Sequence, residues 1–336
     1  MKKSFRKTRR KGILTRFMAG LLLGLLLPAC LLAGCGSGEI QADGGGYIHI
    51  EEEAAILAES PAAKTAAPDG KAVKAEASGI LVKESSDVSI DYSNTEDGYV
   101  MVKFKAESSQ KIKAQVKGPT TTYTYNVKPG QWEVFPLSDE NGKYQVSVLK
   151  NVSGNKYAVL ASQSFTVKMK DEFAPFLLPN QYVNYAEAPE TVKKAASLCK
   201  KAEEPLKKVE KIYKYVVKNF TYDTEKARTV KSGYLPDLDK VLKAKKGICF
   251  DYAAVMAGML RSEGVPCKLV VGYAGEAYHA WISVYVEGEG WIEGVVYFDG
   301  ESWQRMDPTF ASSGGQSKSI MKYIGDGSNY SAKYFY

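Results

Sequence analysis

Apolar and polar residues alternate with a period of two between Val88 and Met169, which is typical of β-strands with one buried face. Turn-forming pairs such as Asp97-Gly98 and Gly118-Pro119 separate the apolar runs. The runs with one apolar face are Val100, Val102 and Phe104; Ile112, Ala114 and Val116; Tyr123, Tyr125 and Val127; Tyr144, Val146 and Val148; Phe165, Val167 and Met169. About seven short strands of this kind predict a small β-sandwich of the immunoglobulin-like type over residues 87–170.

The period changes to that of a helix after a connector, 173–185, that contains Pro175 and Pro179. Helices are predicted from Pro189 to about residue 201 and from Pro205 to about residue 220, each with one apolar stripe. The next segment, 223–236, has no periodicity and is long enough to predict a functional loop near a site. The sequence therefore predicts an α+β fold, with a second domain over 171–336.

Cys249 stands at the start of a third predicted helix, directly after Gly247 and Ile248. The apolar residues from Phe250 to Leu260 recur at helical spacing, and Gly264-Val265-Pro266 ends the helix. A thiol at a helix N-terminus lies near the positive end of the helix dipole and near free N–H groups, which favour the nucleophilic thiolate. A buried cysteine that packs as a small hydrophobic residue is the alternative.

A histidine and an aspartate follow in the strands predicted after this helix. A buried strand is expected over 268–273, and the next one, 278–286, carries His279 on the face that it shares with Trp281 and Ser283. Two further strands are expected over 290–298 and 303–306, and the last run ends at Asp307. Cysteine chemistry on an acyl group needs a thiolate that attacks, an imidazole that moves the proton and a carboxylate that orients the ring. Cys249, His279 and Asp307 are the candidates.

The net charge of +7 belongs to the first residues of the chain. Residues 1–34 hold eight basic residues and no acidic one, which leaves 37 basic against 38 acidic residues in the rest. The charge therefore gives no argument for a nucleic-acid partner. The basic start, the apolar run after it and the sequence Leu32-Ala33-Gly34-Cys35 resemble a bacterial lipoprotein signal, in which Cys35 becomes the lipidated first residue. An uncleaved membrane anchor is the alternative. Either way, we expect the body of the protein to lie outside the cytoplasm, held at the membrane.

Residues 36–86 are rich in Gly, Ala, Lys, Glu and Ser, and this composition predicts a flexible tether in which His49 is solvated. Beyond the leader three cysteines are present, so at least one is unpaired within the chain. Cys199 falls on a predicted helix stripe and Cys267 opens a predicted strand. Both are interpreted as packing residues, with a disulfide between them as the alternative.

Residues from about 186 to 310 resemble the transglutaminase-like superfamily. The resemblance is carried, in order, by Tyr215-Val216-Val217-Lys218-Asn219-Phe220-Thr221-Tyr222-Asp223, Gly247-Ile248-Cys249-Phe250-Asp251-Tyr252-Ala253, Gly264-Val265-Pro266, His279-Ala280-Trp281 and Asp307-Pro308-Thr309. It implies a papain-like core of a helix and an antiparallel barrel, with Cys249 as nucleophile, His279 as base and Asp307 as the orienting carboxylate. It implies no metal and no cofactor, and it does not cover the predicted sandwich.

The function expected from this resemblance is cleavage or transfer at amide bonds of a peptide or protein, including cell-wall peptide, through a thioester on Cys249. Hydrolysis is favoured over cross-linking because water needs no second substrate site. An oxyanion donor besides the Cys249 N–H is not assigned, with Tyr222 and Tyr234 as guesses. The alternative from another class is a non-catalytic module that binds wall or protein ligands, because one fold serves many functions.

Overall fold

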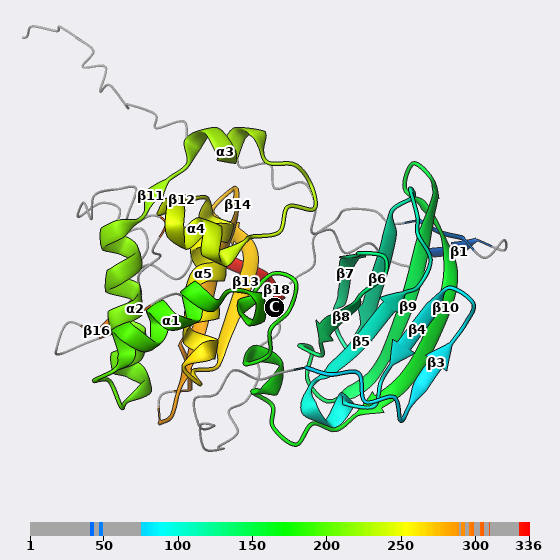
Figure 1. Cartoon of the computed structure of the whole chain (residues 1–336), viewed down its shortest axis with the longest axis horizontal. Helices are drawn as coiled ribbons and strands as arrows, with labels where there is room; N and C mark the ends of the chain where they lie inside the picture. The colour runs from blue at the N-terminus through cyan, green and yellow to red at the C-terminus, as the bar shows by residue number, and fades with distance from the viewer. Residues whose placement is uncertain are drawn as a thin grey trace, which may run out of the picture.

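The structure is a computed structural model of the 336-residue chain, and it describes residues 41–43, 47–49, 75–288, 290–292, 296–298, 303–305, 309 and 329–336. The predicted leader with Cys35, and also Asp307, lie outside the described residues. Within the described ranges, no helix is both long enough and apolar enough to cross a membrane. The architecture is mixed, with many strands and few helices, and Figure 1 shows, for the described residues, a half built mainly of strands beside a half that holds the α-helices.

Two antiparallel sheets make up the half built mainly of strands. The larger sheet has, in spatial order, β1 (Gln41–Asp43), β2 (Tyr47–His49), β10 (Lys156–Val167), β9 (Gly142–Ser153), β6 (Ile112–Lys117) and β7 (Thr122–Val127). The smaller sheet has β3 (Val82–Glu84), β4 (Val88–Asp91), β5 (Tyr99–Phe104) and β8 (Trp132–Pro136), with a 3-10 turn at Thr95–Asp97 before β5. The alternation along these strands sends the predicted apolar faces into one shared core, where Tyr125 meets Phe135 of the other sheet at a centroid distance of 4.8 Å. Whether this pair of sheets is of the immunoglobulin type stays a prediction.

The strands begin earlier in the chain than the sequence pattern suggests. β1, β2 and β3 fall within 36–86, the predicted tether. β2 pairs antiparallel with β10, so that His49 stands opposite Lys156 in the ladder. The sequence pattern gives no signal for these strands because the segment is poor in apolar residues. An edge strand forms through backbone hydrogen bonds to its neighbour and needs no strongly apolar face.

The other half packs helices on a four-stranded antiparallel sheet. Its helices are α1 (Pro189–Cys199), α2 (Pro205–Asn219), α3 (Thr224–Thr229), α4 (Leu238–Ala244) and α5 (Cys249–Ser262), with 3-10 turns at Ala174–Phe176 and Tyr185–Glu187. Its sheet runs β15 (Gly290–Ile292), β14 (Ala277–Val286), β13 (Cys267–Ala274) and β18 (Tyr330–Phe335). Two small pairs complete it, parallel β11 (Thr221–Tyr222) with β12 (Lys246–Gly247) and antiparallel β16 (Val296–Phe298) with β17 (Trp303–Arg305).

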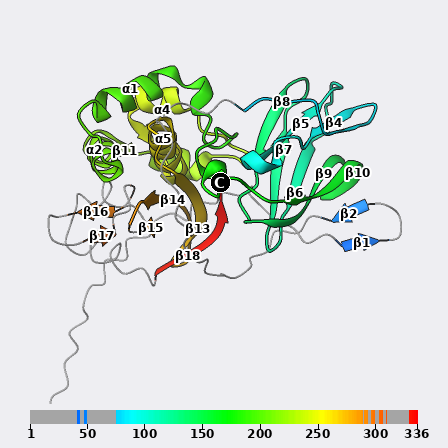
Figure 2. The same cartoon turned by 90° about the horizontal axis from the view of Figure 1, so that it is seen from below.

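The predicted helices over 189–201, 205–220 and from 249 onward are present, and Pro189 and Pro205 each stand at the start of a helix. α5 is buried along its whole length because α1, α2 and α4 surround it and the sheet covers it. Figure 2 shows the helices together on one face of the sheet formed by β15, β14, β13 and β18. The single predicted strand over 290–298 is instead two strands, β15 and β16.

An aromatic cluster joins the two halves. Tyr336 lies within 5.8 Å, between ring centroids, of Tyr123 and Tyr125 of β7 and 4.5 Å from Tyr182 of the connector. Tyr182 in turn meets Phe250 of α5 at 5.6 Å. One hydrophobic core therefore runs from the sheets of the first half into the helices of the second. The domain ranges expected from the sequence stay a prediction, and their apolar interiors are continuous.

Candidate active site

The turn that leads into α5 is held by a buried carboxylate. Asp251 is 0% exposed, and its Oδ2 accepts a hydrogen bond from the backbone N–H of Ile248 at 2.8 Å. A Cβ on Gly247 would lie 2.6 Å from the Cβ of Asp251, so only glycine fits at this position. Cys249 follows as the first residue of α5, as the sequence predicts, and its side chain is 1% exposed.

Two side chains from the preceding segment complete the surroundings of Asp251. Lys226 of α3 donates to Asp251 Oδ2 at 2.6 Å, and the hydroxyl of Tyr234 donates to Oδ1 at 2.6 Å. Lys226 Nζ also donates to the Tyr234 hydroxyl at 2.6 Å and lies 4.2 Å from the centre of its ring. We call these three residues, Lys226, Tyr234 and Asp251, the Asp251 cluster.

The segment 223–236 therefore lies against the Cys249 turn, as expected for a loop near the site. It is not wholly without regular structure, because α3 forms within it and is capped by Asp223, whose side chain accepts from the Lys226 N–H at 3.0 Å. Tyr234 is not favoured as an oxyanion donor, since its hydroxyl proton already bonds to Asp251. Burial raises the pKa of Tyr234 above its usual value, and the Asp251 carboxylate raises it further.

His279 is the third residue of β14 and is 5% exposed. Its ring lies 6.1 Å from the Trp281 ring and 6.4 Å from the Tyr330 ring, between centroids. In the ladder it stands opposite Gly272 of β13, where a Cβ would fall 2.9 Å from the Trp281 ring. Tyr330 belongs to β18, a strand that sequence reasoning missed, although the alternation in Tyr330-Ser331-Ala332-Lys333-Tyr334 was a signal for it.

The topology brings Cys249 and His279 to the same end of the helix-and-sheet layer. α5 ends at Ser262 and β13 begins at Cys267, whose carbonyl accepts from Arg261 Nε at 2.9 Å, so the chain reverses and β13 runs back along α5. The 14 residues of α5 cover about 21 Å, and the step from Cys267 to Gly272 covers about 17 Å. His279, opposite Gly272, therefore stands toward the end at which α5 begins.

One face of β14 packs against α5, and His279 lies on the other face. Ala280, Ile282 and Val284 belong to the core that contains α5. His279 falls on the alternate face with Trp281, because successive side chains of a strand point to opposite sides. Any contact between His279 and Cys249 must therefore form at the end of the layer, beside the first turn of α5, and not across its middle.

The remaining cysteines are buried and free, which answers the disulfide alternative for Cys199 and Cys267. Burial raises the pKa of the Cys199 thiol to about 11 and that of the Cys267 thiol to about 12. Both therefore remain protonated at neutral pH, as expected for packing residues. Thr309, two residues after Asp307, is 4% exposed. No group of three or more His, Cys, Asp or Glu side chains suited to a metal ion occurs in the part of the chain that the structure describes.

The comparisons with known proteins agree with the sequence motifs. Residues 192–308 match the model of the transglutaminase-like superfamily core. The uncharacterized protein YebA of Bacillus subtilis (strain 168) is 25% identical over 203 residues, which are 54% of this chain and 27% of YebA, so the chain spans about a quarter of that relative.

Solved structures give weaker likenesses. A protein of Cytophaga hutchinsonii described as a candidate cysteine protease is 15% identical, over 71% of this chain and 83% of that chain, with a TM-score of 0.36. The periplasmic domain of TgpA from Pseudomonas aeruginosa is 16% identical, over 71% of this chain and 78% of that chain, with a TM-score of 0.34. The similarity that bears on the site is therefore the match of residues 192–308 to the transglutaminase-like superfamily core.

Proposed function

We propose that this protein is a cysteine enzyme that acts on amide bonds of peptides or cell-envelope material through a thioester on Cys249. The observation that carries the proposal is the placement of Cys249 as the first residue of α5, with the turn before it held by a buried carboxylate. A thiolate at this place is stabilised by the helix dipole and by the free N–H groups of the first turn. The family match over residues 192–308 supports the same chemistry.

In the proposed reaction the Cys249 thiolate attacks the carbonyl carbon of the amide, and the C–N bond breaks as His279 gives a proton to the leaving amine. Asp307 accepts the other ring N–H of His279 and so fixes its tautomer. Water, deprotonated by His279, then attacks the thioester and releases the acid and the thiol. An amine in place of water would give cross-linking, and hydrolysis is favoured because it needs no second substrate site.

The location is part of the proposal. Cys35 carries the lipid that anchors the mature chain, and the described part of the protein works outside the cytoplasmic membrane. The leader motif Leu32-Ala33-Gly34-Cys35 supports this. The intact mass of protein purified from its native host tests it, because a mature chain that retains residues 1–34 would contradict lipidation at Cys35.

A second function, a non-catalytic binding module, is favoured by two observations. The Cys249 side chain is 1% exposed, and His279 lies on the face of β14 that alternates with the α5-facing residues. A protein that only binds wall or protein ligands would need neither an accessible thiol nor a thiol–imidazole pair. The two functions therefore differ in whether Cys249 reacts as a thiolate that depends on His279.

The deciding experiment measures the rate at which iodoacetamide modifies Cys249, by mass spectrometry of its peptide, from pH 5 to pH 9. We expect fast modification near neutral pH, ahead of Cys199 and Cys267, whose raised pKa values keep them protonated. His279→Ala should slow the modification of Cys249 to that of an ordinary thiol, whereas His49→Ala should leave it unchanged. Identical pH profiles for the wild type and His279→Ala would contradict the pair and favour the binding module.

A further inference from the structure

The Asp251 cluster places a full pair of opposite charges next to the proposed nucleophile. Asp251 lies two residues after Cys249 in the first turn of α5 and is completely buried. A carboxylate there opposes the formation of a thiolate, because two negative charges in a medium of low dielectric constant repel each other. The Lys226 ammonium, which is 2.6 Å from Asp251 Oδ2 with its side chain 26% exposed, supplies the compensating charge.

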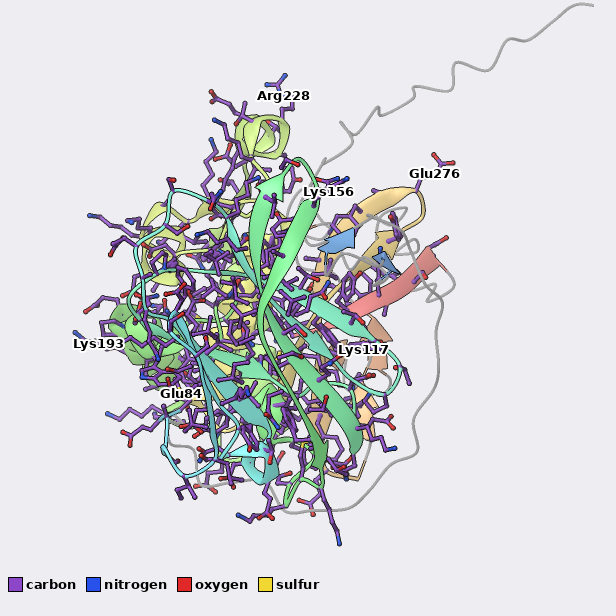
Figure 3. The ribbon with its side chains drawn as sticks, turned by 90° about the vertical axis from the view of Figure 1, so that its right-hand side faces the viewer. Glu84, Lys117, Lys156, Lys193, Arg228 and Glu276 are labelled. Atoms are coloured by element: carbon purple, nitrogen blue, oxygen red, sulfur yellow. The ribbon has the colours of Figure 1, made fainter. Side chains whose placement is uncertain are left out.

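The cluster also connects three segments of the chain through this one carboxylate. Lys226 comes from α3, Tyr234 from the loop after it, and the Ile248 N–H from the turn before Cys249. Both carboxylate oxygens of Asp251 accept hydrogen bonds from these donors. The outer side of α3 faces solvent, where Arg228 points away from the molecule (Figure 3), so the inward Lys226 is the part of α3 that engages the site.

We propose that Lys226 is a positioning residue for Cys249, which neutralises Asp251 and holds the segment 223–236 against the first turn of α5. This inference rests on the proposed role of Cys249 as nucleophile, and it does not depend on His279 as its base. Asp251 orients the turn through Ile248, and Lys226 allows it to do so without suppressing the thiolate. Tyr234 fixes the second carboxylate oxygen and carries no charge at neutral pH.

Other charged groups near this turn are already paired. Asp223, at the N-terminus of α3, lies 3.3 Å from Lys246 of β12, whose side chain is half exposed. Asp237 pairs with Lys240 at 2.7 Å at the start of α4, in contact with solvent. His279 stands at the same end of the layer, on β14. Within the described ranges, Lys226 is the cation that contacts Asp251.

The test compares the pH profile of Cys249 alkylation in the wild type and in a set of full-length variants. Lys226→Met leaves the Asp251 charge uncompensated, so the midpoint of the profile should move up by about one pH unit and the rate at pH 7 should fall about tenfold. Asp251→Asn keeps an acceptor for the Ile248 N–H but removes the negative charge, so the midpoint should move down. Lys226→Arg keeps the positive charge, so its profile should match that of the wild type. The matched control, Lys240→Met, removes an exposed, paired lysine from α4 and should change nothing.

Opposite shifts in Lys226→Met and Asp251→Asn would support the proposal, because loss of structure alone would move both profiles the same way. The double variant Lys226→Met/Asp251→Asn carries neither charge and should return the midpoint close to that of the wild type. This variant also covers the case in which Lys226→Met does not fold. Shifts of the same sign, or no shift in any of these variants, would overturn the proposal. If the profile changes in His279→Ala but not in Lys226→Met, the proposed role of Lys226 is wrong and the proposed function stands. If the profile changes in Lys226→Met but not in His279→Ala, the role of Lys226 stands and the Cys249–His279 pair is contradicted.

Discussion

The guanidinium of Arg261 donates through Nη1 to the backbone carbonyl of Leu178, 83 residues earlier in the chain, at 2.7 Å. The same side chain donates to the carbonyl of Cys267 through Nε and Nη2, and to the carbonyl of Tyr336 through Nη2 at 2.6 Å. It is completely buried, and this burial lowers the pKa of Arg261 to about 10. One side chain near the end of α5 therefore joins the connector, the first strand after α5 and the residue that follows β18.

Replacing Arg261 should destabilise the whole protein. Arg261→Met keeps the apolar stem but leaves three buried carbonyl groups without this donor, so we expect a loss of about 3–5 kcal/mol in the free energy of unfolding. Urea unfolding followed by circular dichroism measures it. Arg228→Met, on the outer side of α3, is the control and should change the free energy of unfolding by less than about 0.5 kcal/mol. A loss below about 1 kcal/mol in Arg261→Met would show that water or other donors replace the guanidinium.

The protein should lose stability as the pH rises above about 10. Burial raises the pKa values of Tyr123, Tyr144 and Tyr234 above the usual value for a phenol. In the unfolded chain these phenols release their protons near pH 10 whereas the folded state keeps them, so the unfolded state binds fewer protons and stability falls with pH. Each contributes up to about 1.4 kcal/mol per pH unit. Arg261 acts in the opposite direction between about pH 10 and 12.5, because its pKa is lowered in the folded state.

Tyr144→Phe isolates one of these contributions. The Tyr144 hydroxyl accepts from the Asp139 N–H at 2.9 Å and donates to the Glu140 carbonyl at 2.8 Å, so the variant should be less stable at pH 7. Above pH 10, however, its stability should fall less steeply than that of the wild type. The measurement is the free energy of unfolding in urea at several values between pH 9 and 11. Parallel curves for the two proteins would contradict the assignment.

Gly272 should tolerate no side chain. Its Cβ would lie 2.1 Å from the carbonyl oxygen of Ser331 in β18 and 2.9 Å from the Trp281 ring, so β18 would have to move. We expect Gly272→Ala to cost about 1–3 kcal/mol and to increase hydrogen exchange of the β18 amides. Gly130→Ala is the control, because space around Gly130 is open and its positive φ of 82° costs about 1 kcal/mol. Unchanged protection of β18 in Gly272→Ala would show that the strand accommodates the methyl group.

The two halves of the protein should unfold together. Tyr182 contacts Tyr125 and Phe250, one from each half, with centroid distances of 5.8 and 5.6 Å. We therefore expect one urea midpoint whether unfolding is followed by the fluorescence of Trp132 in β8 or by that of Trp281 in β14, each measured in a variant whose other tryptophans are replaced by Phe. Tyr182→Ala should lower both midpoints by the same amount. Two separate midpoints in the protein with Tyr182 intact would show that residues 87–170 and 171–336 are independent folding units.

Much of the local structure could be predicted from the sequence, because it depends on neighbours a few residues apart. The period of two marks β5, β6, β7 and β9, and the period of 3.6 marks α1, α2 and α5. The sequence predicts Cys249 at a helix N-terminus because glycine and a run of apolar residues at helical spacing flank it. The hydrophobic effect acts on such patterns whatever lies elsewhere in the chain, so they can be recognised without a structure.

Only the tertiary structure decided which distant residues meet at the site. The partners of Asp251 come from 25 and 17 residues earlier in the chain, and no local pattern distinguishes Lys226 from the neighbouring lysines. The alternation in β14 separates His279 from Ala280 but does not say which face receives α5. That choice depends on the reversal of the chain after Ser262 and on β18, which pairs with β13 from more than 50 residues away. Long-range pairings are decided by the packing of whole elements, in which each buried polar group must find a partner, and this packing gives Arg261 and Asp251 their places.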